Sequence, residues 1–179
     1  MKLVNEPLSG VKLIEPFHHE DCRGAFVKTF HEEMFAELGI FLTVREEFFS
    51  ISAKNVLRGM HFQIPPHAHQ KLVFCTHGRV LDVLIDLRIG SPSYGQSASF
   101  ELSAANRHLV HIPVGVAHGF LSLEDGSCLF YKTDTVHEPS ADAGILWNSF
   151  DFDWPLTSKP ILSHRDEQHP TLAEFSSPF

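Results

Sequence analysis

The stretch THGRVLDVLIDLRIGSPSYG, residues 76–95, decides the fold class of this chain. After a turn at Gly78, side chains alternate between two directions, which is the pattern of a β-strand. One set comprises Val80, Asp82, Leu84 and Asp86, and the other comprises Leu81, Val83, Ile85 and Leu87. The second set is purely aliphatic and predicts a face packed on a core. We interpret Asp82 and Asp86 as solvated strand residues, and the alternative is that they hold nearby arginines.

Short runs rich in Val, Ile, Leu, Phe and Thr, most of them separated by Gly, Pro, Asn or Ser, predict further strands. With the first, they cover residues 11–14, 26–30, 41–52, 56–62, 72–76, 80–87, 97–102, 108–112, 120–123 and 128–132. Only residues 31–38 suggest a helix, with Phe35 and Leu38 on one face and Gly39 as its stop. We expect an antiparallel all-β protein, with residues 155–170 wrapping over its outside.

Composition narrows the class of protein. A chain of 179 residues, 43% hydrophobic and 20% charged, fits one globular domain spanning 1–179. The net charge of −8 disfavours nucleic acid and anionic membranes as partners. Three scattered cysteines form no CxxC pair, and no apolar run has the length of a signal peptide or membrane span. These features predict a cytoplasmic protein.

Thirteen histidines draw attention to a metal site. The segment PVGVAH (113–118) has the PxGxxH form of the second cupin motif, and HAH (67–69) is similar to the first. In metal cupins a Glu follows the HxH and balances the cation. Here Lys71 follows instead, and the next Glu is Glu101. We therefore expect no metal, and a site formed by His67, His69 and His118 stays open as the alternative.

The segment LRGMHFQ (57–63) carries another histidine inside a predicted strand. Alternation would place Arg58, Met60 and Phe62 on one face, with His61 and Gln63 on the other. His61 and Gln63 would then look into the barrel together. Taken alone, a histidine is more often a surface or hydrogen-bonded core residue than a catalyst.

Several segments in the same order resemble the dTDP-4-dehydrorhamnose 3,5-epimerase family. They are LRGMHFQ (57–63), KLV (71–73), GRVLDVLIDLRIGSPSYG (78–95), IPVGVAHGF (112–120), YKT (131–133) and ILSHRD (161–166), and the resemblance runs over about residues 17–175. It implies a cupin-type jelly-roll barrel of antiparallel strands with a few short helices. The barrel core would span about 40–150, with the N-terminal strands and the C-terminal segment packed around it. It also implies a homodimer without metal or other cofactor.

The resemblance implies epimerisation of a nucleotide-diphospho-4-keto-6-deoxy sugar at C3 and C5, the carbons next to the ketone. Such a reaction needs a base, a group that stabilises the enolate, and an acid on the opposite face. By position, His61 matches the base and Asp166 its carboxylate partner. Lys71 matches the cation beside the ketone, and Tyr131 matches the acid. Without the resemblance, Asp166 would pass for a solvated residue and Tyr131 for a hydrogen-bonded core residue.

Five further residues match substrate-binding positions of the family. Arg58 and Arg23 would bind the diphosphate, and Arg23 would reach the active site of the neighbouring subunit. Phe26 resembles an aromatic residue near the nucleotide, while Gln63 and His118 would line the cavity. Surface ion pairs for the arginines and a core role for Phe26 are the alternatives.

The chain departs from the family pattern at two nucleotide-facing places. Phe48 stands where the family has an Asn, and Val136 and His137 stand where it has a Tyr. The 4-keto-sugar chemistry is therefore better supported than the thymidine base, and a GDP- or CDP-linked substrate stays open. So do an epimerase that inverts C3 alone, a metal-dependent cupin enzyme and a non-catalytic sugar-binding cupin.

Overall fold

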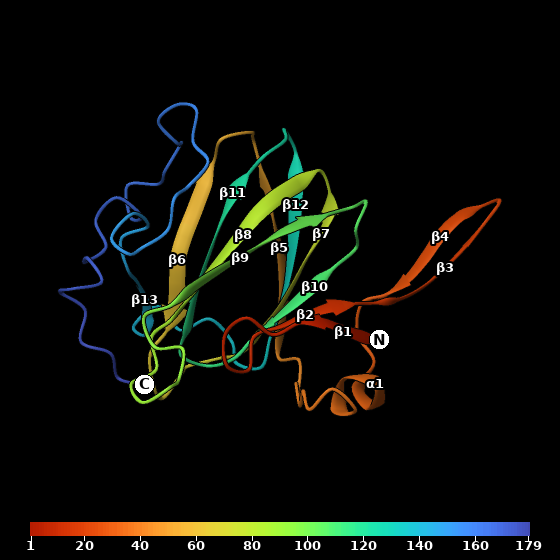
Figure 1. Cartoon of the computed structure of the whole chain (residues 1–179), viewed down its shortest axis with the longest axis horizontal. Coiled ribbons are helices and arrows are strands. Elements are labelled where there is room, and N and C mark those ends of the chain that lie inside the picture. The colour runs from red at the N-terminus through yellow and green to blue at the C-terminus, as the bar shows by residue number, and fades with distance from the viewer.

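Two antiparallel sheets face each other in the computed structural model, which describes residues 1–179 (Figure 1). In sheet order, the first contains β1 (Lys2–Asn5), β2 (Lys12–Glu15), β10 (Leu109–Ile112), β7 (Lys71–His77), β12 (Ser127–Thr133) and β5 (Glu46–Ser52). The second contains β13 (Asp142–Gly144), β6 (Leu57–Gln63), β11 (Val116–Ser122), β8 (Arg79–Asp86) and β9 (Ser97–Ser103). Neighbours such as β2 and β10 are far apart in sequence, as in a jelly roll. The predicted all-β class is confirmed.

The main core lies between the two sheets. Val80 and Leu84 project inward from β8 and pack with Val73 of β7 and Leu129 of β12. Tyr131, two residues after Leu129, belongs to the same buried cluster. The buried side chains of β12, from Leu129 to Tyr131, therefore face the interior between the two sheets.

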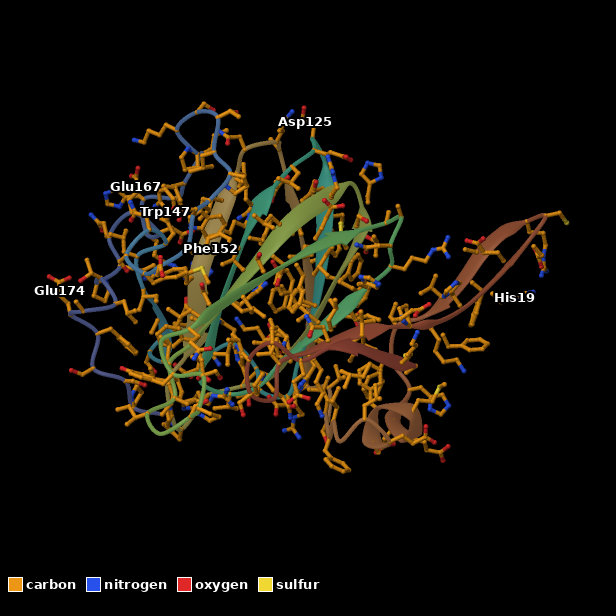
Figure 2. The ribbon with its side chains drawn as sticks, viewed as in Figure 1. His19, Asp125, Trp147, Phe152, Glu167 and Glu174 are labelled. Carbon is orange, nitrogen blue, oxygen red and sulfur yellow. The ribbon has the colours of Figure 1, made fainter.

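The N-terminal part adds a hairpin and a helix. Strands β3 (Phe17–Asp21) and β4 (Gly24–Lys28) project away from the barrel, and His19 marks this arm in Figure 2 (Figures 1 and 2). Helix α1 (Glu32–Ala36) is capped by the His31 side chain, which accepts the N–H of Met34, and it buries Phe35. No helix in the structure has the length and apolar character needed to cross a membrane.

The C-terminal segment wraps along β6, as predicted for residues 155–170 (Figure 1). Val56 pairs with Ile161 in an isolated parallel bridge. Phe152, which Figure 2 labels near β6, belongs to an aromatic group that packs against the buried Met60 and Phe62. This wrapping places the residues that follow Ile161 beside the strand that carries His61.

Some predicted element boundaries were wrong. The strand predicted for 41–52 begins only at Glu46, because Leu42 packs instead with Phe35 beneath α1. Strands β1, β3 and β13 were not predicted. The first two are exposed throughout and show no apolar alternation, and β13 has three residues.

The interpretation of Asp82 and Asp86 as solvated was also wrong, because both are fully buried. Both faces of β8 are covered: Val80 and Leu84 face the other sheet, while Val83 and Ile85 face the C-terminal segment. Asp86 holds Arg88, as the alternative stated, and Asp82 pairs with His118. A buried carboxylate is stable only with such partners.

Candidate active site

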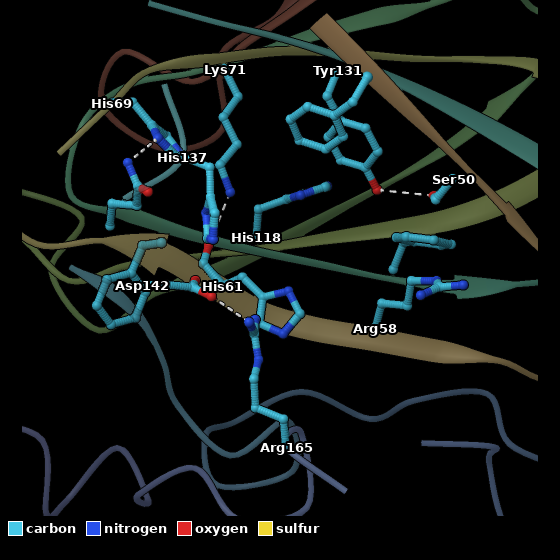
Figure 3. Close-up of a pocket in the computed structure, with 14 residues that line it drawn as sticks. Ser50, Arg58, His61, His69, Lys71, His118, Tyr131, His137, Asp142 and Arg165 are labelled. Carbon is cyan, nitrogen blue, oxygen red and sulfur yellow. Dashed lines mark hydrogen bonds and ion pairs between the residues drawn. The ribbon is translucent and has the colours of Figure 1, made fainter. Parts of the chain in front are cut away.

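A cavity of about 280 Å³ opens between the sheets (Figure 3). Strands β5, β6, β7, β11, β12 and β13 line it together with three loop residues, His69, His137 and Arg165. Its lining residues are Phe48, Ser50, Arg58, His61, Phe62, Gln63, His69, Lys71, His118, Phe120, Tyr131, His137, Asp142 and Arg165. Most of the candidates from the sequence thus meet in one place.

His61 of β6 is paired with a carboxylate from the C-terminal segment. Its Nε2 lies 2.8 Å from Oδ1 of Asp166. The Gly59 N–H donates to Oδ2 of Asp166 at 3.3 Å, and the Asp166 N–H donates to the Ser163 hydroxyl at 3.1 Å. Because the ionised carboxylate only accepts, Nε2 is the donor and Nδ1 keeps its lone pair. The pairing that the resemblance implied is thus present in the structure.

The protonation of this pair suits a base. Burial lowers the pKa of His61, and Asp166 offsets only part of that effect. Burial would raise the pKa of Asp166, but hydrogen bonds from His61 and the Gly59 amide outweigh it and hold the pKa below its usual value. A neutral imidazole beside a carboxylate anion is the state in which His61 can accept a proton near pH 7.

Arg58 lines the same cavity as His61, which contradicts the simple alternation predicted for residues 57–63. His118 pairs with His61 and Phe120 with Arg58, so Gly59 and Met60 together face the single residue Gly119. This bulge brings positions three apart onto one side. Gly59 has φ +135°, and a Cβ there would lie 2.4 Å from Gly119 Cα, so only glycine fits.

Lys71 enters the cavity from β7 of the opposite sheet. Its buried Nζ donates to the backbone carbonyl of His61 at 3.2 Å. Burial lowers the pKa of Lys71 to about 8, against the opposing attraction of Asp142 and Asp82. A poorly hydrated ammonium group therefore sits beside the proposed base, where it can stabilise a developing oxyanion.

Tyr131 of β12 is buried beside two residues of β5. The Phe48 ring stacks on the Tyr131 ring, with centroids 4.7 Å apart, and the Ser50 hydroxyl lies 3.5 Å from the phenol oxygen. Burial raises the pKa of Tyr131, so the phenol stays protonated and can act as a proton donor. Phe48, where the resemblance leads us to expect an Asn, thus lies in the cavity wall.

His118 and Gln63 both line the cavity, but protein groups occupy much of their hydrogen-bonding capacity. His118 Nε2 lies 2.6 Å from Oδ2 of the fully buried Asp82. The Gln63 amide nitrogen donates to the His67 carbonyl at 2.8 Å and lies 3.0 Å from His69 Nδ1. These contacts fix the cavity wall. His69 and His118, two of the histidines in the alternative metal site, therefore contact Gln63 and Asp82. The side chains whose potential metal-ligating atoms converge are His61, Asp166 and His169.

Arg165, Asp142 and His169 lie near the site and were not predicted as site residues. Arg165, next to Asp166, bonds to Asp142 of β13, and both line the cavity with His137. His169 packs edge-on against His61, with ring centroids 5.6 Å apart. Sequence neighbourhood could have suggested Arg165, whereas Asp142 and His169 carry no local signal.

Arg23 and Phe26 do not reach the cavity of their own chain. They lie on the β3–β4 hairpin, with an exposed fraction of 84% for the Arg23 side chain and 60% for Phe26. Arg23 bonds to Asp21 on the same hairpin. The expected contribution of Arg23 to a partner's site stays a prediction.

Comparison with known proteins identifies the family. The model of the dTDP-4-dehydrorhamnose 3,5-epimerase family matches residues 5–174. The chain is 42% identical to the dTDP-4-dehydrorhamnose 3,5-epimerase of Escherichia coli K12, over 97% of this chain and 96% of that protein.

Solved structures agree. The dTDP-6-deoxy-D-glucose-3,5-epimerase of Legionella pneumophila in complex with dTDP-4-keto-L-rhamnose superposes with a TM-score of 0.93 at 34% identity, covering 98% of this chain and 94% of that one. A 3′-monoepimerase from Streptomyces bikiniensis in complex with dTDP-quinovose gives 0.88 at 32% identity, over 94% and 86%. The jelly roll, the cavity between its sheets and the match over nearly the full chain lead to one conclusion: this chain belongs to the dTDP-4-dehydrorhamnose 3,5-epimerase family, whose members are carbohydrate epimerases.

Proposed function

We propose that this protein epimerises a nucleotide-diphospho-4-keto-6-deoxy sugar at C3 and C5. His61 removes the proton next to the ketone through Nδ1, and Asp166 stabilises the resulting imidazolium. Lys71 offsets the negative charge on the enolate oxygen. Tyr131 returns a proton from the opposite face. No metal or nicotinamide takes part in these steps.

One observation carries this proposal: base and acid reach the cavity from opposite sheets. His61 lies on β6 and Tyr131 on β12, and Figure 3 draws them on different walls of the cavity, with Lys71 also entering it. Inversion of a carbon requires that the proton leave from one face and return to the other. A substrate held between the two walls meets that requirement at each centre.

Arginine side chains support the binding of an anionic substrate, although the chain as a whole is acidic. Arg58 and Arg165 line the cavity and present guanidinium groups suited to phosphate oxygens. Arg23 serves the neighbouring subunit of a homodimer, which is supported by its exposure on a projecting hairpin. A dTDP-linked sugar is the favoured substrate, because the relatives bear that name.

A C3-only epimerase is the second candidate, because the monoepimerase relative covers most of the chain. A GDP- or CDP-linked sugar is a third candidate, because Phe48 and His137 depart from the family pattern at nucleotide-facing places. We also propose that residues 1–179 act as one domain and work in the cytoplasm. The compartment is supported by three free cysteines, of which Cys75 is buried.

Solvent deuterium exchange into dTDP-, GDP- and CDP-linked 4-keto-6-deoxy sugars tests the proposal. We expect exchange at C3 and C5 with the dTDP sugar and at least about a 10²-fold loss in His61→Ala. Proton NMR of the product separates double from single inversion. Undiminished exchange in His61→Ala would refute the mechanism, and binding without exchange in the wild type would favour a sugar-binding module.

A further inference from the structure

We infer that His61, Asp166 and His169 form a binding site for a divalent transition metal such as Zn²⁺, and that the bound metal switches off the epimerase. The binding part stands on the geometry of the three side chains. The inhibitory part rests on the proposed role of His61 as the base.

The three side chains offer ligand atoms that converge. His61 Nε2, Asp166 Oδ1 and His169 Nε2 all lie within 4.8 Å of one another. Oδ1 lies 2.8 Å from the first nitrogen and 3.9 Å from the second. Ligand atoms in a tetrahedral zinc site with bonds of about 2.0 Å are about 3.3 Å apart. Small rotations of the rings would therefore bring all three atoms to one ion.

His169 has a free ligand atom. Its Nε2 is buried and has no hydrogen-bond partner, and the side chain as a whole is only 11% exposed. The neutral ring offers a lone pair for a metal when Nε2 is the unprotonated nitrogen. An unsatisfied nitrogen beside an Asp–His pair is an unusual arrangement that a metal would satisfy.

The backbone leaves room for the His169 ring at this place. A Cβ on Gly144 of β13 would lie 2.6 Å from Nε2 and 2.7 Å from Cε1 of His169. The absence of a side chain at Gly144 thus lets His169 pack against β13 and approach His61 edge-on.

Charge and access also fit a cation. Asp166 supplies an anion; the Arg165 Nε lies 3.8 Å from its Oδ1, and the Arg165 guanidinium is also bonded to Asp142, which compensates part of its charge. The side chain of His61 is 27% exposed and lines the cavity, and the Asp166 and His169 side chains lie behind it, 4% and 11% exposed. Two imidazole nitrogens and one carboxylate favour Zn²⁺, Ni²⁺ or Cu²⁺ over Mg²⁺, which prefers oxygen ligands.

Metal binding would disable the base by moving a proton. In the free protein, the His61 proton is on Nε2 and the lone pair on Nδ1 faces away from Asp166. A metal bonded to Nε2 displaces that proton, and the neutral ring then carries it on Nδ1. The nitrogen that should accept the substrate's proton is then occupied.

The binding test uses Co²⁺, whose visible absorption reports tetrahedral coordination, titrated into the full-length protein without substrate. We expect one equivalent to bind and to be displaced by Zn²⁺, and we expect His169→Ala to weaken binding at least about tenfold. His169→Phe retains a ring against Gly144 and removes the nitrogen, so it covers the case in which the alanine variant fails to fold. His164→Ala, at an exposed histidine of the same segment, is the matched control.

The inhibition test measures deuterium exchange with and without Zn²⁺. Wild type and His164→Ala should lose exchange, while His169→Phe should keep it at the same Zn²⁺ concentration. Unchanged Co²⁺ absorption in both His169 variants, or its loss in His69→Ala alone, would overturn the site. Zn²⁺ binding without inhibition would overturn the inhibitory part. A failure of the proposed function looks different, because exchange would be absent in wild type before any metal is added.

Discussion

Nε2 of His61 lies 2.8 Å from Oδ1 of Asp166, although 105 residues separate them in sequence. The contact forms because the C-terminal segment pairs with the start of β6: Leu57 N–H donates to the Ile161 carbonyl at 3.0 Å. The carboxylate fixes which imidazole nitrogen carries the proton. The reactivity proposed for His61 therefore depends on how the end of the chain docks.

Asp166→Asn should reduce solvent deuterium exchange by about 10²-fold or more, because the amide neither fixes the His61 tautomer nor stabilises the imidazolium. Substrate KM should change much less, since Asp166 lies behind His61 and does not line the cavity. Glu167→Gln, an exposed neighbour, is the control. Equal losses of exchange in both variants would contradict a specific role for Asp166.

Tyr131→Phe should separate proton removal from inversion. The base remains, so label still enters the substrate, but return of a proton to the opposite face fails and little inverted product forms. Proton NMR in deuterated water reports both. Tyr94→Phe, at the half-exposed second tyrosine, should behave as wild type. Normal inversion by Tyr131→Phe would assign the acid to another group.

The pH dependence of kcat should show a loss of activity above about pH 8. Burial lowers the pKa of Lys71 to about 8, so the ammonium group loses its proton as the pH rises through that value. On the acid side, activity should fall where His61 becomes protonated, below its ordinary pKa of 6.5. A Lys71→Arg variant should move the alkaline limb upward. An alkaline limb unchanged in that variant would exclude Lys71 as its cause.

Arg23→Ala should raise KM if this residue completes the partner's site. Mixing inactive His61→Ala with Arg23→Ala subunits then provides a sharper measurement. A mixed dimer combines both defects in one site and leaves the other site intact, so activity should exceed the average of the two separate variants. Lys28→Ala, on the same hairpin, is the control. No gain on mixing, with dimers verified by light scattering, would argue against a shared site.

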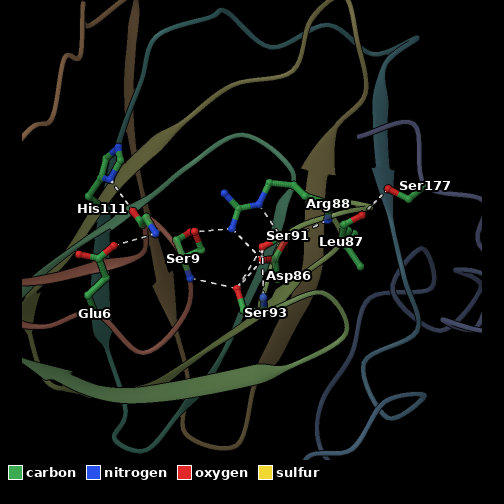
Figure 4. Close-up of polar contacts among 10 residues, drawn as sticks. Glu6, Ser9, Asp86, Leu87, Arg88, Ser91, Ser93, His111 and Ser177 are labelled. Atoms are coloured by element: carbon green, nitrogen blue, oxygen red, sulfur yellow. Dashed lines mark hydrogen bonds and ion pairs between the residues drawn. The ribbon is translucent and has the colours of Figure 1, made fainter.

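Asp86→Ala should destabilise the fold by about 3 kcal/mol or more, because it leaves the Arg88 guanidinium without its partner. Figure 4 shows that the carboxylate joins Arg88 to Ser91 and Ser93, with both serine hydroxyls 2.6 Å from Oδ2. Urea unfolding measures the loss, and Asp153→Ala at an exposed position should cost little.

The same network gives wild-type stability a pH dependence. Burial would raise the pKa of Asp86, but hydrogen bonds from Arg88 and the two serines outweigh it and lower the pKa to about 2. Because the folded pKa lies below the unfolded value of 3.8, this contribution is present above about pH 4 and disappears as the pH falls toward 2. Asp86→Ala should lack that part of the acid dependence.

The sequence by itself determined the class of the fold and the types of chemical group. Period-two alternation with turn residues marks strands wherever one face is apolar. The motif around His61 resembles the family through the order of its neighbouring residues, which the sequence alone shows. The same local logic failed for Asp82 and Asp86, since alternation shows which side chains share a face but does not show what covers that face. It also failed for β1 and β3, which have no apolar face.

Only the tertiary structure decided which of these groups meet. The bulge at Gly59 turns Arg58 toward the same cavity as His61, against the alternation of the strand. The docked C-terminal segment brings Asp166 and His169 to His61, and the sheet opposite β6 brings Tyr131 and Lys71. Such contacts join residues through backbone pairing between distant segments, and their geometry is set by the packing of the whole barrel rather than by any local pattern.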